Sequence, residues 1–112
     1  MSLARALARL PEDRITEGVI RDVLSLFQHH PGVWLLESDV AGKTGHPSGE
    51  VSKVVRVMTE SFVLESRGEP ATYRLVPGAV LTYEIEGYMR RVQSHRDHVE
   101  TNIARFRERY GG

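Results

Sequence analysis

Residues 47–76 of the chain have the sequence PSGEVSKVVRVMTESFVLESRGEPATYRLV, and this stretch decides the fold. In its first part, residues 47–58, apolar side chains recur with the spacing of one helical face. These apolar positions are Val51, Val54, Val55 and Met58. Two short runs of strand-forming residues, 62–64 and 72–76, follow on either side of a turn at residues 67–70. The stretch therefore predicts a helix followed by a β-hairpin.

Two further helices are predicted upstream of this stretch. Residues 16–30 carry a broad apolar face, with Thr16 as the expected N-cap, and a Pro-Gly pair follows them. Residues 39–44 form a shorter helix that Ser38 is expected to cap. Between the two helices, residues 33–35 form an apolar run that could pair with the hairpin as a third strand, and Trp34 is expected to lie in the core.

The ends of the chain have helical patterns of their own. Residues 2–10 place three leucines on one face, and we expect this face to pack on the rest of the domain or on a partner subunit. The predicted organisation is an N-terminal helical arm at 1–14, a helix-and-hairpin domain at 15–78, and a long C-terminal helix at 79–112.

The long C-terminal helix is predicted to mediate dimerisation. Apolar residues recur in it every seven positions, and a helix of about 45 Å, at about 1.5 Å per residue, is longer than a small core can cover. A second copy of the helix would cover the remainder. The alternative is a helix that folds back at Gly87. The expected dimer interface contains Ile85, Met89, Val92, His95, Val99, Ile103 and Phe106.

Composition excludes several classes of function. The 112 residues include 15 basic and 15 acidic side chains, which argues against a nonspecific nucleic-acid coat but not against a local binding face. There is no cysteine, so disulfides, thiolate catalysis and cysteine-based zinc sites are excluded. No run of about 18 apolar residues and no signal-peptide pattern is present, and we expect a cytoplasmic protein.

The stretch from Val19 to Val76 resembles the winged helix-turn-helix transcription regulators, in particular small MarR- and PadR-type proteins and the bacterial replication terminator protein. The similarity lies in residues 48–56, 60–66 and 73–75 and in the order of helices and hairpin. It implies a mainly α fold with a small β-hairpin (α+β). It also implies a homodimer that binds double-stranded DNA in a sequence-specific manner and regulates transcription.

The resemblance also implies which residues meet DNA. The helix at 47–58 would enter the major groove, with Arg56 against a guanine and Lys53 against a phosphate. The arginines of the hairpin would contact the backbone. The expected DNA-binding residues are Lys43, Ser48, Gly49, Ser52, Lys53, Arg56, Arg67 and Arg74. Two alternatives stay open: a winged helix that binds a protein, and an architectural or replication-linked DNA-binding protein.

Catalysis and cofactor binding find little support in the sequence. No serine or threonine has a histidine and a carboxylate at a suitable spacing, so we expect no enzyme. His95 and His98 could share a helix face, but without a third ligand we expect neither a metal nor a cofactor. An effector, if one binds, would lie at the dimer interface or between the core and the final helix.

Overall fold

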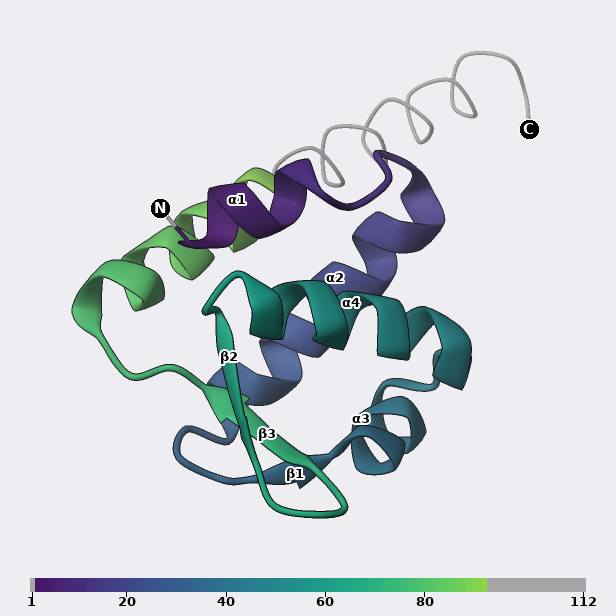
Figure 1. Ribbon diagram of the computed structural model, residues 1–112. Helices are drawn as coiled ribbons and strands as arrows, with labels where there is room; N and C mark the ends of the chain where they lie inside the picture. The colour runs from purple at the N-terminus through teal and green to yellow at the C-terminus, as the bar shows by residue number, and fades with distance from the viewer. Residues whose placement is uncertain (1, 93–112) are drawn as a thin grey trace, which may run out of the picture.

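A computed structural model describes residues 2–92, which form a mainly helical α+β fold with a small antiparallel sheet (Figure 1). The helices are α1 (Ser2–Ala8), α2 (Arg14–His29), α3 (Glu37–Thr44), α4 (Ser48–Glu60) and a further helix over residues 79–92. The strands are β1 (Leu35–Leu36), β2 (Leu64–Arg67) and β3 (Thr72–Leu75). The predicted α+β class is confirmed.

The sheet has three strands in the order β1-β3-β2, and both pairings are antiparallel. Leu35 pairs with Tyr73, while Leu64 pairs with Leu75. The third strand that the sequence indicates is therefore present, although it begins at Leu35 rather than at residue 33. It joins the hairpin through β3 and thereby ties the start of α3 to the hairpin.

The core lies between α2, α4 and the sheet, and α3 closes it below (Figure 1). The predicted apolar face of α4 is buried, because Val51, Val55 and Met58 have no exposed surface and Val54 has almost none. Phe27 of α2 belongs to the same cluster. Burying such side chains is the main contribution to stability in a domain of this size.

The first turn of α2 corrects the predicted N-cap. The helix begins at Arg14, and Asp13 is its N-cap; the Asp13 carboxylate accepts a hydrogen bond of 2.7 Å from the Thr16 backbone N–H. Thr16 is buried inside the helix. In the same way α3 begins at Glu37, before the predicted cap Ser38. The sequence predicts both helix starts too late, because several side chains near each start could accept the capping hydrogen bond.

The helix over residues 79–92 packs into the core of its own chain. Ile85, Tyr88 and Val92 are buried in the same apolar cluster as Leu3 and Ala6 of α1. The expected packing of the N-terminal leucines on the domain is thus confirmed. Within the single chain Ile85 is 1% exposed and Val92 8% exposed. That both residues lie at a dimer interface stays a prediction.

The other residues of the predicted interface divide into two groups. Met89 is partly buried against the core. The remaining four, His95, Val99, Ile103 and Phe106, lie outside the described residues. The helix continues through Gly87 in the described part, which excludes a fold-back at that position.

Phe62 differs from its prediction as a strand residue. It lies between α4 and β2 with φ of 63°, a left-handed conformation, and its side chain is 67% exposed.

Left-handed backbone costs most residues about 1–2 kcal/mol, and asparagine tolerates it better. We expect Phe62→Asn to raise the free energy of unfolding by about 0.5–1 kcal/mol, measured by urea denaturation. A decrease would show that the aromatic ring contributes packing that outweighs the backbone strain.

Candidate functional site

The exposed face of α4 is the candidate site. Ser48, Gly49, Lys53 and Arg56 are exposed and Ser52 is half-buried, opposite the buried apolar face of the helix. A Cβ atom added at Gly49 would meet nothing within 4 Å, so the first turn of α4 is open. Small residues at the start of the helix and longer cations further along would let another molecule approach the backbone closely.

The two cations of this face differ in their surroundings. Lys53 Nζ lies 3.5 Å from a carboxylate oxygen of Glu50, one helical turn earlier, and is itself 71% exposed. Such an exposed ion pair contributes little to stability, so another anion can easily replace Glu50 as the partner of Lys53. Within residues 2–92, no carboxylate lies within 4 Å of the Arg56 guanidinium. Arg56 is therefore available to an external acceptor.

The turn before α4 fixes its first residues. The α3 helix ends at Gly45, which has φ of 74° and suits the left-handed C-cap position. The next residue, His46, pairs through Nε2 with Asp22 of α2 at 2.7 Å. This contact ties the turn to α2, so that α4 starts at a set place on the core. Lys43 is exposed in the last turn of α3, on the approach to α4.

The pair between Asp22 and His46 gives a prediction for stability against pH. Burial raises the pKa of Asp22, but hydrogen bonds from His46 and Arg21 outweigh it, and the net pKa lies below its ordinary value. Because the folded pKa is depressed, the charge stabilises the fold above about pH 4 and this contribution is lost as pH falls through the folded pKa. We expect Asp22→Asn to lower the free energy of unfolding by about 1 kcal/mol near neutral pH.

Chemical denaturation of wild type and Asp22→Asn across the acid range measures this effect. The difference between the two proteins should shrink toward zero as the pH falls, because Asp22 is then protonated in the wild type. The exposed Glu12 makes no ion pair with another described residue, so Glu12→Gln should change stability by less than about 0.5 kcal/mol. A difference that stays constant with pH would contradict the assignment.

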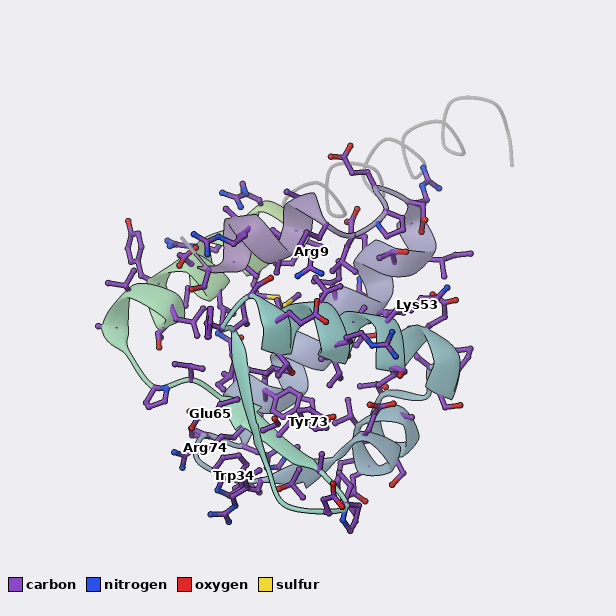
Figure 2. The ribbon with its side chains drawn as sticks, viewed as in Figure 1. Arg9, Trp34, Lys53, Glu65, Tyr73 and Arg74 are labelled. Atoms are coloured by element: carbon purple, nitrogen blue, oxygen red, sulfur yellow. The ribbon has the colours of Figure 1, made fainter. Side chains whose placement is uncertain are left out.

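The arginines of the hairpin lie around Trp34, which corrects its predicted place in the core. Trp34 is half-buried, and its ring centroid lies 4.2 Å from the Arg67 guanidinium carbon and 4.4 Å from that of Arg74. Arg74 also donates a hydrogen bond to Glu65. Arg67 is exposed near the hairpin tip. The structure therefore separates Arg67 and Arg74 from the α4 residues, as Figure 2 shows for Arg74 and Lys53.

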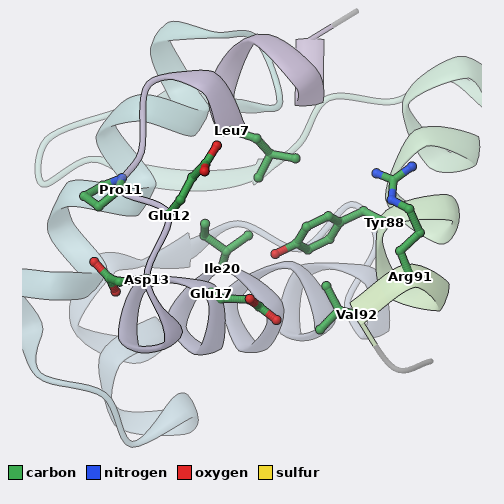
Figure 3. Close-up of a pocket in the computed structure, with 9 residues that line it drawn as sticks. All are labelled: Leu7, Pro11, Glu12, Asp13, Glu17, Ile20, Tyr88, Arg91 and Val92. Carbon is green, nitrogen blue, oxygen red and sulfur yellow. The ribbon is translucent and has the colours of Figure 1, made fainter. Parts of the chain in front are cut away.

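A pocket of about 430 Å³ lies where α1, the start of α2 and helix 79–92 meet (Figure 3). Tyr88 points from helix 79–92 across this pocket toward Ile20 and Glu17 of α2. Burial, and then the charge of Glu17, raise the pKa of Tyr88 above its ordinary value. Of the two places expected for any effector, the dimer interface and the space between the core and the final helix, this cavity corresponds to the second.

No group of three histidine, aspartate or glutamate side chains within residues 2–92 could hold a metal ion. His95 and His98 lie outside this range. In the same part of the chain, no helix is both long and apolar enough to cross a membrane. Comparisons of the sequence and structure with protein-family models, with curated proteins and with solved structures found no match.

Some of these features could not be found by sequence analysis. The spacing of α4 residues gave its exposed face directly, because helical periodicity assigns faces. By contrast, Trp34 and Arg67 are far apart in the chain, and so are Asp22 and His46. A lone tryptophan among apolar neighbours indicates burial, and nothing local shows that two arginines from another segment cover it. Only the pairing of β1 with β3 brings them together.

Proposed function

We propose that this chain binds double-stranded DNA in a sequence-specific manner, with α4 in the major groove. The order of α2, β1, α3, α4, β2 and β3, with β3 between the other two strands, supports a winged helix-turn-helix arrangement. In helix-turn-helix proteins the second helix of the motif contacts base edges, and the first crosses the backbone. By position in the chain, α4 is the helix expected to contact base edges, and α3 is the helix expected to cross the DNA backbone.

The observation that carries this proposal is the exposed face of α4. It combines small residues near the helix start with Lys53 and with Arg56, which has no carboxylate partner among residues 2–92. In the proposed complex Arg56 donates two hydrogen bonds to a guanine, and Lys53 exchanges Glu50 for a phosphate. Lys43, near the end of α3, would lie toward the DNA backbone beside the groove. Arg67 and Arg74 lie around Trp34, away from this face, so the proposed contacts to DNA come from α3 and α4.

The proposed assembly is a homodimer that regulates transcription. With Ile85 and Val92 buried in their own chain, dimerisation would use Met89 and the residues beyond 92. Two copies of α4 related by a two-fold axis would contact half-sites about 34 Å apart, or one DNA turn. A palindromic site is the expected target.

A salt titration of binding to a labelled random-sequence duplex tests the proposal, with the solution mass measured in the same buffers. Each phosphate contact contributes about −0.9 to the slope of log affinity against log salt. We expect a clearly negative slope from a dimer, followed by recovery of a palindromic site in a selection experiment. Absence of binding even at low salt would contradict DNA binding.

A winged helix that binds a protein is the second candidate. Three observations favour it: the net charge of zero, and the Glu50 and Glu65 carboxylates beside Lys53 and Arg74. These pairs lower the positive potential that would attract DNA. If the duplex titration shows no binding, the exposed face of α4 becomes the first surface to test by protein capture and substitution.

A further inference from the structure

The sheet has an outer face that points away from the helices. Tyr73 packs against the core, and because side chains alternate along a strand, Arg74 faces the other side. The register places Glu65 opposite Arg74 on that side, and the buried Leu64 on the core side. Figure 2 shows Trp34, Arg74 and Glu65 together beyond the sheet, with Tyr73 toward the helices. This outer face is separate from the exposed face of α4.

Two arginine side chains of the outer face lie over the Trp34 ring. The guanidinium carbons of Arg67 and Arg74 lie 4.2 and 4.4 Å from its ring centroid, so they are at most 8.6 Å apart, the sum of the two distances. Arg74 is paired with Glu65. Arg67 is exposed, and no carboxylate among residues 2–92 lies within 4 Å of it. A guanidinium stacked on a ring keeps its N–H donors free at its edge.

We propose that this outer-face cluster, defined as Trp34, Arg67 and Arg74, binds an acidic segment of a partner protein. Arg67 would hold a carboxylate of that segment by two parallel hydrogen bonds, the geometry for which a guanidinium is suited. The half-buried Trp34 ring supplies an apolar contact beside it. Tryptophan and arginine together are the residues most enriched at the energetic centres of protein interfaces.

Two observations favour a protein over nucleic acid at this surface. Trp34 and Arg74 lie apart from Lys53 of α4 (Figure 2), so this surface is not part of the α4 face proposed to bind a duplex. The chain has no net positive charge, which disfavours covering two faces with phosphates. The proposal does not depend on DNA binding by α4.

Trp34 is the only tryptophan of the chain, so intrinsic fluorescence reports on this surface directly. The probe is poly-L-glutamate, titrated into the 112-residue chain at low salt. We expect a saturable change in Trp34 emission that salt weakens. Arg67→Ala should weaken binding about tenfold or more, and Arg67→Lys, which cannot make the two parallel bonds, should restore only part of it.

The control is Arg90→Ala, which removes the same charge from an exposed position on helix 79–92 and should leave binding unchanged. Urea midpoints close to wild type would show that Arg67→Ala, Arg67→Lys and Arg90→Ala are folded. Absence of a Trp34 response, or equal losses in Arg67→Ala and Arg90→Ala, would overturn the proposal. A parallel titration with duplex DNA tests whether the surface prefers nucleic acid to an acidic peptide. An Arg67-dependent response to DNA but not to poly-L-glutamate would assign the surface to nucleic acid and would also overturn the proposal.

Discussion

Replacing Lys53 and Arg56 together by alanine is expected to remove sequence-specific DNA binding while leaving the fold intact. Both side chains are exposed on α4, so their loss takes nothing from the core. A guanidinium that binds a guanine through two hydrogen bonds contributes about 1–3 kcal/mol of discrimination. Loss of a phosphate contact at Lys53 lowers affinity across all sequences and reduces the salt slope by about 1.

The single variants separate these two roles. Arg56→Ala should lower affinity for the selected site far more than for random duplex, whereas Lys53→Ala should weaken both about equally. Fluorescence anisotropy at several salt concentrations measures affinity and slope in the same experiment. Circular dichroism and urea midpoints close to wild type show that the helix is intact.

A matched control removes the same charge elsewhere. Arg5 on α1 and Arg90 on helix 79–92 are both exposed, and Arg5→Ala with Arg90→Ala lowers the net charge by the same amount. This double variant should bind the selected site within about twofold of wild type at moderate salt, where distant charges are screened. Equal losses in the two double variants would show that total charge, rather than the face of α4, determines binding.

Ile85→Ala is expected to lower the free energy of unfolding by about 2–5 kcal/mol, the range for truncating a buried isoleucine. The Ile85 side chain is 1% exposed within a single chain and belongs to the core cluster that joins α1 to helix 79–92. Its removal leaves a cavity between elements from opposite ends of the described chain. Urea denaturation measures the loss, with the slope of the transition checked for two-state behaviour.

The concentration dependence of this loss distinguishes a core residue from a dimer contact. If Ile85 packs within its own chain, the difference from wild type stays the same at every protein concentration. A difference that appears only at concentrations where dimers form would show that Ile85 is a dimer contact. Val80 is 69% exposed on the same helix, so Val80→Ala should change stability by less than about 0.5 kcal/mol.

Local patterns were sufficient for much of the fold and for the candidate site. The apolar spacing in residues 47–58 predicted α4 and its buried face, and therefore also the face that carries Lys53 and Arg56. Strand-forming runs around a turn predicted the hairpin, and the short apolar run at 33–35 predicted β1 to within two residues. These features are encoded locally, because helical and strand periodicities depend only on neighbouring positions.

Local sequence patterns therefore predict the α+β class, the order of the helices and strands and the composition of the exposed face of α4. The tertiary structure decided which surface covers each apolar stripe and which charges meet. Ile85 has the seven-residue spacing of a dimer contact, yet α1 of the same chain shares its cluster. Trp34 has apolar neighbours, yet the pairing of β1 with β3 places it under Arg67 and Arg74. Periodicity shows that a face is apolar but not what covers it, since the covering residues come from distant parts of the chain.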